Sequence, residues 1–263
     1  MVAYLKYKLS HLHAYQQVLL VHTVVYLILQ LFITVTAGIS ADKVVYYAGW
    51  SGDLVNILSR PWTLITHLLV HVSFAHFFLN LLVLYVIGKE LEHLIGSAKW
   101  WKTYLLSTLG GILVYSVLAN FLNFENHFLV GNSAANMGLV FALVGIDYNK
   151  RINFWGVIIL EMKWVALFFI LLDIIGIRQG WNAGGSWAHF GGAIVGWLHW
   201  KGSNSVKLSH STRHRRPKSD DEFNAERADK EQQLNSILDK INRSGYDSLS
   251  RSEKEFLKSQ SQG

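Results

Sequence analysis

Residues 188–196 read AHFGGAIVG, which places a histidine inside an apolar segment rich in small residues. Gly192 and Gly196 follow His189 by three and seven positions, so they lie on its side of an α-helix. Small residues let the backbones of two membrane helices approach closely. The stretch therefore predicts a closely packed membrane helix that carries an ionisable side chain into the bundle interior.

Two further stretches combine apolar and polar residues in the same way: HVSFAHFFLN at 71–80 and GNSAANMG at 131–138. Hydrocarbon offers polar groups no water to bond, and ionisable residues at membrane depth indicate a functional site by default. The polar side chains that we single out here are His71, His76, Asn80 and Ser133.

The composition is typical of a membrane protein with a soluble tail. Of 263 residues 51% are hydrophobic, and the mean hydropathy is +0.24. Residues 202–263 hold 12 of the 24 Lys and Arg and 10 of the 18 Asp and Glu. We predict a membrane domain at 1–201, a basic juxtamembrane linker at 202–219 and a cytoplasmic helical tail at 220–263. The absence of cysteine excludes disulfides and thiolate chemistry.

A bilayer requires about 20 apolar residues per helix, and this rule predicts six spans. The expected fold is all-α: a polytopic six-helix bundle, with an apolar segment at 152–162 that could lie at the membrane interface. The spans are expected at about 17–38, 75–94, 100–122, 133–147, 163–177 and 186–200.

The basic residues predict the orientation of these spans. One side of the six-span arrangement carries nine of them, and the other side carries only Lys43, Arg60 and Arg178. By the positive-inside rule both termini are cytoplasmic, and Ser133 faces the outer half of the membrane. The nine are Lys6, Lys8, Lys89, Lys99, Lys102, Lys150, Arg151, Lys163 and Lys201.

Ser133 and His189 could form a nucleophile and its base, because an alcohol needs such a partner to attack. A helix that begins at Ser133 would also aim its first N–H groups at the point where an oxyanion forms. His76 and Asn80 are four residues apart, so they share one helix face and could donate further hydrogen bonds.

On these residues the chain resembles the rhomboid intramembrane serine proteases. The resemblance covers about residues 17–201, and its three motifs together are very specific. They are His-x4-His-x3-Asn (His71, His76, Asn80), Gly-x-Ser (Gly131, Ser133) and Ala-His-x2-Gly-x3-Gly (Ala188, His189, Gly192, Gly196).

The resemblance implies a serine endopeptidase that cuts transmembrane protein substrates within the lipid bilayer, with Ser133 as nucleophile and His189 as general base. It implies a dyad without an essential aspartate, an oxyanion hole from His76, Asn80 and the Ser133 amide, and no metal or cofactor. No nucleic-acid partner is expected. A bacterial inner (plasma) membrane fits the lysine-rich inner side, and the oligomeric state is open.

Three positions depart from the family pattern. Ala134 replaces the glycine that usually follows the serine, and Thr63 stands where the first outer loop often has arginine after tryptophan. Met137 replaces an aromatic residue that packs on the catalytic histidine in many members. A thioether can still pack on an imidazole, so these changes remove no catalytic group.

Alternative readings stay open. Ser133 could be a packing serine, and Asp173 inside the fifth span is expected to be a buried, hydrogen-bonded acid rather than a catalytic one. His67 and His71 have a zinc-like spacing, but Leu68 occupies the position where a metalloprotease needs glutamate. The main rival is a catalytically inactive rhomboid-like protein that binds transmembrane segments without cutting them.

The tail has its own pattern. Leu234, Ile237, Leu238 and Ile241 recur at helical spacing. A second short helix is expected from Ser250, with Glu253 completing a capping box. The two helices could fold on each other or dock on a partner.

Overall fold

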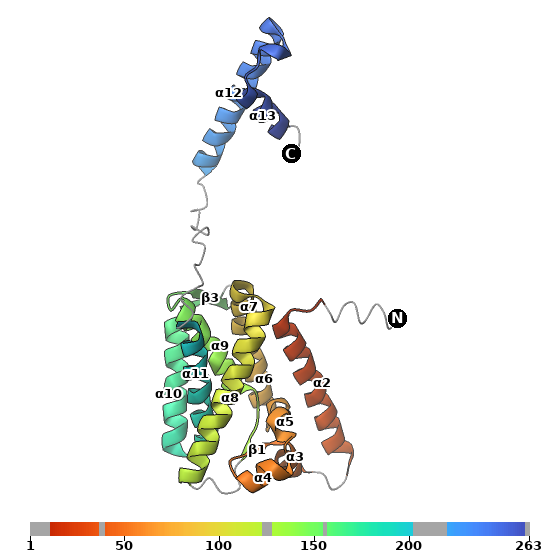
Figure 1. Cartoon of the computed structure of the whole chain (residues 1–263), viewed down its shortest axis with the longest axis vertical. Helices are drawn as coiled ribbons and strands as arrows, with labels where there is room; N and C mark the ends of the chain where they lie inside the picture. Colours follow the sequence, from red (N-terminus) through yellow and green to blue (C-terminus); the bar gives the residue numbers. More distant parts are fainter. Residues whose placement is uncertain (1–10, 37–39, 123–127, 155–156, 202–219, 261–263) are drawn as a thin grey trace. The chain divides into compact units, whose positions relative to one another are not determined.

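The computed structural model describes residues 11–36, 40–122, 128–154, 157–201 and 220–260. The chain divides into two compact units, Met1–Ser205 and Val206–Gly263, and helices dominate both (Figure 1). The predicted linker at 202–219 lies outside the described residues. The domain limits 1–201 and 220–263 remain predictions.

The first unit is built mainly from long helices joined by short connections. An apolar segment of 22 residues, Phe74–Ile95, consists of two α-helices and a π-helical turn between them. The helices are α2 (Ala14–Val35), α3 (Ala41–Ala48), α4 (Leu54–Ser59), α5 (Thr63–Leu69), α6 (Phe74–Val83), η1 (Leu84–Gly88), α7 (Lys89–Ile95), α8 (Ser97–Leu122), α9 (Ser133–Ile146), α10 (Met162–Gln179) and α11 (Ala183–Lys201).

Three helical segments within the described residues are long and apolar enough to cross a membrane: Ala14–Val35, Phe74–Ile95 and Ser97–Leu122. Helix α9 is apolar but shorter. The spans expected at 163–177 and 186–200 fall within α10 and α11. Helix α10 carries three charged side chains and α11 is rich in glycine, so composition alone does not mark either helix as membrane-spanning.

The predicted helical fold class is confirmed in its coarse form, and two small antiparallel sheets accompany the helices. Strands β1 (Trp50–Ser51) and β2 (Phe128–Leu129) pair with Trp50 opposite Leu129. Strands β3 (Arg151–Phe154) and β4 (Ile158–Glu161) form a hairpin where the sequence suggested an interfacial apolar segment. Isoleucine favours extended backbone because its branched side chain packs well on a pleated surface.

The connection between α2 and α6 is fastened next to the segment that leads into α9. The indole Nε1 of Trp50 donates to Ser116 Oγ on α8 at 2.9 Å, and the β1–β2 pair ties Trp50 to the chain just before Ser133. Arg60 is buried, donates to the Tyr46 carbonyl and lies 4.1 Å above the Tyr46 ring. These contacts hold the connection between α2 and α6 against the segment that precedes α9.

Helix α9 forms the centre of the first unit. It packs most extensively against α11 and α8 (Figure 1), and Ala135, Val140 and Leu143 are fully buried. In contrast, α2, α8 and α10 expose many large apolar side chains, including Leu31, Leu113 and Phe168. Such continuous apolar surface is unfavourable in water, so it indicates a lipid environment.

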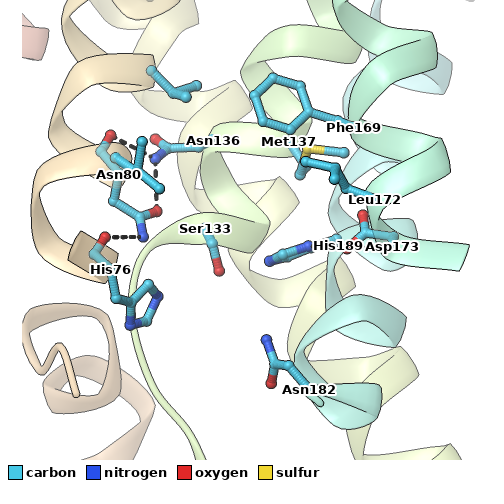
Figure 2. Close-up of a pocket in the computed structure, with 12 residues that line it drawn as sticks. His76, Asn80, Ser133, Asn136, Met137, Phe169, Leu172, Asp173, Asn182 and His189 are labelled. Carbon is cyan, nitrogen blue, oxygen red and sulfur yellow. Dashed lines mark hydrogen bonds and ion pairs between the residues drawn. The ribbon is translucent and has the colours of Figure 1, made fainter. Parts of the chain in front are cut away.

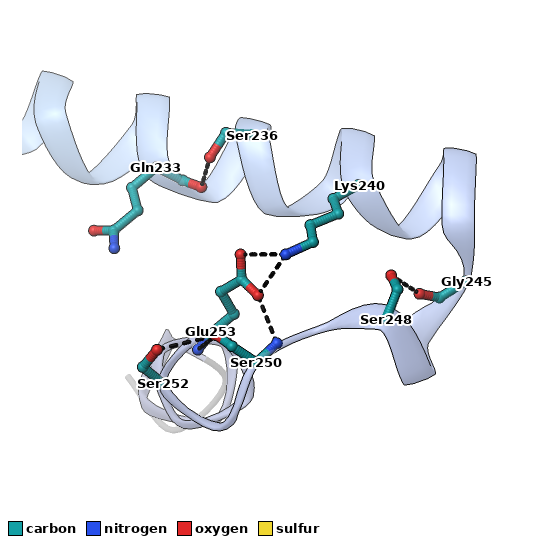
Figure 3. Close-up of polar contacts among 8 residues, drawn as sticks. All are labelled: Gln233, Ser236, Lys240, Gly245, Ser248, Ser250, Ser252 and Glu253. Atoms are coloured by element: carbon teal, nitrogen blue, oxygen red, sulfur yellow. Dashed lines mark hydrogen bonds and ion pairs between the residues drawn. The ribbon is translucent and has the colours of Figure 1, made fainter.

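The tail is a hairpin of α12 (Asp220–Ser244), a 3₁₀ turn η2 (Tyr246–Ser248) and α13 (Arg251–Gln260). The helices fold on each other, one of the two arrangements that the sequence allowed. Lys240 Nζ donates to both carboxylate oxygens of Glu253 at 2.9 Å (Figure 3). The capping box is confirmed: Glu253 N donates to Ser250 Oγ, and Ser250 N donates to Glu253 Oε2. Ile237 and Leu249 are buried, but Leu238 is exposed.

Candidate active site

Ser133 is the first residue of α9, and the backbone just before it is held in an unusual conformation. Gly131 has φ of +95°, where a side chain is strained. A Cβ at Gly131 would lie 2.8 Å from Cε1 of His76. The Gly131 N–H donates to the His67 carbonyl at 2.7 Å. Glycine therefore lets the chain turn into α9 while His76 packs directly against it.

His189 lies on α11 with its two ring nitrogens in different surroundings. Nδ1 is 2.7 Å from Oδ1 of Asp173 on α10. Nε2 is buried and has no hydrogen-bond partner among the described residues. Figure 2 shows the imidazole between Asp173 and Ser133, with the Ser133 hydroxyl directed into the space beside the ring. The free nitrogen is thus available to a reacting group in that space.

Close contact between α9 and α11 brings these residues together. A Cβ at Gly192 would lie 2.0 Å from the Ala134 carbonyl oxygen, and one at Gly196 would lie 2.1 Å from that of Gly138. Neither position can hold a side chain without moving the backbone. The two glycines therefore fix the separation between the helix of His189 and the helix that Ser133 begins.

A cavity of about 210 Å³ lies between α6, α9 and α10, with His189 of α11 in its wall. One part of its lining is apolar: Leu79 and Val83 from α6, and Phe169 and Leu172 from α10. The polar part is formed by His76, Asn80, Ser133, Asn136, Asp173, Asn182 and His189 (Figure 2). A chain entering from the apolar side would meet the serine and the histidine together.

A row of side-chain amides fixes the orientation of Asn80. Nε2 of His71 donates to Asn132 Oδ1 at 3.3 Å, and Asn132 Nδ2 donates to Asn136 Oδ1 at 3.4 Å. Asn136 Nδ2 then donates to Asn80 Oδ1 at 3.0 Å. Because its oxygen is taken, Asn80 must present its NH₂ group elsewhere, and one proton goes to the His76 carbonyl at 2.8 Å. The second proton is left for a ligand of the cavity.

The structure brings most of the singled-out residues to one place. Ser133, His189, His76, Asn80 and Met137 all line the cavity. His71 and Gly131 lie behind it, with the ring centroids of His71 and His76 5.1 Å apart. The predicted nucleophile and base are not hydrogen-bonded to each other through Nε2 of His189, which has no partner within the described residues. Such bonds are often long in free enzymes and tighten when substrate binds.

Two contacts could not be read from the sequence. Asp173 is buried and hydrogen-bonded, as expected, but its partner is His189. The sequence marked Asp173 as unusual only because it is a carboxylate inside an apolar segment. Asn132 and Asn136 flank Ser133 and looked like ordinary polar residues at a helix start. Their role depends on the contacts of Asn132 with His71 and of Asn136 with Asn80 on α6, which no local pattern predicts.

The two histidines of the metal hypothesis are engaged in other contacts. His67 Nδ1 is 2.7 Å from the Thr63 carbonyl oxygen, and His71 Nε2 bonds Asn132. In the described part of the chain, no group of three or more His, Asp or Glu side chains is arranged to hold a metal ion.

Comparison with known proteins shows the family to which the chain belongs. The family model of the Rhomboid domain matches residues 58–201, which is more than half of the chain. The protein therefore belongs to the rhomboid family. Together with the three long apolar helices, this membership indicates an integral membrane protein.

A curated relative is RHOMBOID-like protein 5 from Arabidopsis thaliana. It is 33% identical over 140 residues, which is 52% of this chain and 42% of that protein. The match thus spans less than half of the relative's length. Residues 218–263 match a separate family of unknown function, DUF6576, so the tail is similar to a module that carries no assigned role.

Proposed function

We propose that the protein is an intramembrane serine endopeptidase that hydrolyses peptide bonds in or near transmembrane segments of other membrane proteins. The observation that carries the proposal is the meeting of two groups in one cavity: Ser133 at a helix N-terminus, and His189 with a buried, unbonded Nε2. A nucleophile, a base and oxyanion donors are the parts that acyl transfer requires.

The reaction follows from these roles. Ser133 Oγ attacks the carbonyl carbon of the scissile bond while its proton passes to His189 Nε2. The free N–H of the Asn80 amide, His76 and the Ser133 backbone N–H donate to the oxyanion. The tetrahedral intermediate collapses as His189 gives its proton to the leaving amine, which leaves an acyl-enzyme. Water then attacks the acyl carbon while His189 takes a proton from it. His189 returns that proton to Ser133 Oγ as the bond from Oγ to the acyl carbon breaks, which releases the carboxylic acid product.

The substrate would enter sideways from the lipid. The apolar lining between α6 and α10 supports this route, because it leads from lipid-facing helices to the polar residues (Figure 2). The substrate helix must unwind locally, since a helical carbonyl is already hydrogen-bonded. Small and helix-destabilising residues near the cut site should therefore be preferred.

The proposed topology has six spans and both termini in the cytoplasm of a bacterial cell, with the protein in the inner (plasma) membrane. Its support is the charge distribution: Lys89 begins α7 and Lys99 lies in the first turn of α8, while Lys150 directly precedes β3 and Arg151 begins it. Both regions lie at the same end of the first unit (Figure 1). The positive-inside rule assigns that end to the cytoplasm.

Labelling with a fluorophosphonate serine probe tests the proposal. The purified protein in detergent is compared with Ser133→Ala and His189→Ala, and with Ser107→Ala as a matched control. Ser107 is a buried serine on α8 whose Oγ has no described hydrogen-bond partner. We expect labelling of the unchanged protein and of Ser107→Ala, no labelling of Ser133→Ala, which lacks the nucleophile, and only slow residual labelling of His189→Ala.

The rival function predicts a different result. A catalytically inactive rhomboid-like protein would bind a transmembrane peptide but remain unlabelled. The observation that favours this rival is that Ser133 makes no hydrogen bond to His189 Nε2 within the described residues. Peptide binding without labelling, in a protein shown to be folded, would refute the protease proposal.

A further inference from the structure

Asp173 is a carboxylate in a costly position. It lies in α10 among apolar neighbours and is 6% exposed. The residues on either side of it in the sequence, Leu172 and Ile174, are both exposed as they would be toward lipid. An ionisable group at such depth requires a partner or a function. Within the described residues its hydrogen-bond partner is His189 Nδ1, at 2.7 Å.

We propose that Asp173 is a positioning residue for His189, completing a Ser–His–Asp arrangement in this chain; the inference rests on the proposed protease function. A carboxylate can only accept, so Nδ1 must carry the proton. The neutral imidazole then has its lone pair on Nε2, the nitrogen that faces the Ser133 side of the cavity (Figure 2). That tautomer is the one that can take a proton from the serine.

The contact also favours the reaction electrostatically. When His189 takes the proton of Ser133, a positive charge forms on a ring whose side chain is only 18% exposed. The Asp173 carboxylate at 2.7 Å stabilises that charge, and the low dielectric of the bundle strengthens the interaction. The same carboxylate limits rotation of the ring.

A purely structural role fits the contacts less well. An acid that only fastens α10 to the bundle would use both carboxylate oxygens, since an unbonded buried polar atom is costly. Oδ2 of Asp173 has no hydrogen-bond partner in the described part of the chain. The carboxylate makes one strong contact, and that contact is directed at the proposed base.

The test compares Asp173→Asn and Asp173→Leu with the unchanged protein. Asparagine keeps the shape but can donate to Nδ1, which stabilises the wrong tautomer; in other serine proteases this change lowers turnover about 10⁴-fold. We expect fluorophosphonate labelling of Ser133 to slow at least about 100-fold in both variants. Asp147→Asn, at an exposed acid on the C-terminal side of α9, is the matched control and should label normally.

Two further measurements distinguish a positioning role of Asp173 from a purely structural role. For cleavage of a transmembrane peptide, kcat should fall while KM and the thermal unfolding temperature stay close to those of the unchanged protein. In a His189→Ala background, Asp173→Asn should cause no further loss, because the aspartate acts only through that ring. Full reactivity of Asp173→Leu, or a loss that persists equally in the His189→Ala background, would overturn the inference.

The two proposals fail in different ways. A folded wild-type protein that neither labels nor cleaves overturns the protease function, and with it the role of Asp173. A reactive wild-type protein whose Asp173 variants react equally fast overturns only the positioning role. Partial recovery in Asp173→Glu, which keeps an acceptor but shifts its position, would support the inference.

Discussion

Asn136 on α9 donates from Nδ2 both to the side-chain oxygen and to the backbone carbonyl of Asn80 on α6, at 3.0 Å in each case. Asn136 lies three residues after Ser133, so the helix that begins at the proposed nucleophile also sets the orientation of a proposed oxyanion donor. Asn80 itself is 6% exposed and has little freedom to turn while this contact holds.

Replacing Asn136 should therefore reduce activity although it is not a proposed catalytic residue. In Asn136→Leu the Asn80 oxygen loses its donor, and the amide is free to turn that oxygen toward the cavity. Loss of one oxyanion donor lowers turnover about 10²–10³-fold in other hydrolases, and we expect a loss of similar size here. Labelling kinetics measure it, with Asn80→Ala as reference.

Asn120→Leu is the control for this prediction. Asn120 also donates from its side-chain amide to backbone carbonyls, at Gly52 and Ser116, but it is not among the cavity-lining residues. Equal losses in both variants would show that any amide replacement disturbs the bundle. That result would remove the orienting role of Asn136.

Gly192→Ala should destabilise the first unit and slow labelling of Ser133. The added methyl group would meet the Ala134 carbonyl at 2.0 Å, so α9 and α11 must separate. Overpacking of this kind costs about 1–3 kcal/mol, measurable by thermal unfolding in detergent. Gly145→Ala is the matched control, because a Cβ at Gly145 would lie no closer than 3.3 Å to another atom, the Trp197 carbonyl oxygen. An equal loss of stability in Gly145→Ala would contradict the steric explanation.

We expect Glu92 on α7 to stabilise the packing of α7 against the first residues of α2 and α8. Its buried carboxylate accepts from the backbone N–H groups of Ala14 and Tyr15 at 2.9 and 3.0 Å, and from Ser97 Oγ at 2.6 Å. Glu92→Ala leaves these donors unpaired, and each buried unpaired donor costs about 1–3 kcal/mol. We expect a lower unfolding temperature, measured on the full chain in detergent.

Glu90→Ala provides the comparison, two residues earlier on the same helix. Its carboxylate lies 3.6 Å from Lys150 Nζ and is partly exposed, and exposed pairs contribute about 0–1 kcal/mol. A destabilisation as large as that of Glu92→Ala would argue against the role assigned to the buried hydrogen bonds.

The tail hairpin should loosen in acid. Hydrogen bonding to Lys240, followed by the Ser250 backbone and hydroxyl, lowers the pKa of Glu253 to about 2 (Figure 3). A lowered carboxyl pKa in the folded state means that its stabilisation is present above the ordinary value of 4.5 and is lost as pH falls from there toward 2. Hydrogen exchange of residues 246–257 in the full chain, corrected for intrinsic rates, measures this loss.

Glu253→Gln should reproduce the loosened tail at neutral pH, because the amide lacks the charge that holds Lys240. Glu231→Gln, on the exposed surface of α12, should leave exchange unchanged. Exchange in Glu253→Gln equal to that of the unchanged protein at pH 7 would show that the Lys240 contact does not hold the hairpin.

The motifs at 71–80, 131–138 and 188–196 were enough to predict the family, because the spacing of their polar and small residues can be read from one sequence. Local patterns also located α8, α9, α12 and the Ser250–Glu253 capping box, since helix starts and apolar periodicity are local properties. The β3–β4 hairpin was missed, because a short apolar run is compatible with strand and with an interfacial segment.

The sequence by itself determined which residues are candidates for the proposed chemistry: a serine, a histidine and an asparagine inside apolar segments, where the lack of water makes polar groups energetically costly. Only the tertiary structure decided their partners. Asp173 meets His189, and Asn136 meets Asn80, across contacts between different helices. The direction in which one helix face meets another depends on packing around the whole bundle, including the bare backbone at Gly192 and Gly196, and no local pattern contains that information.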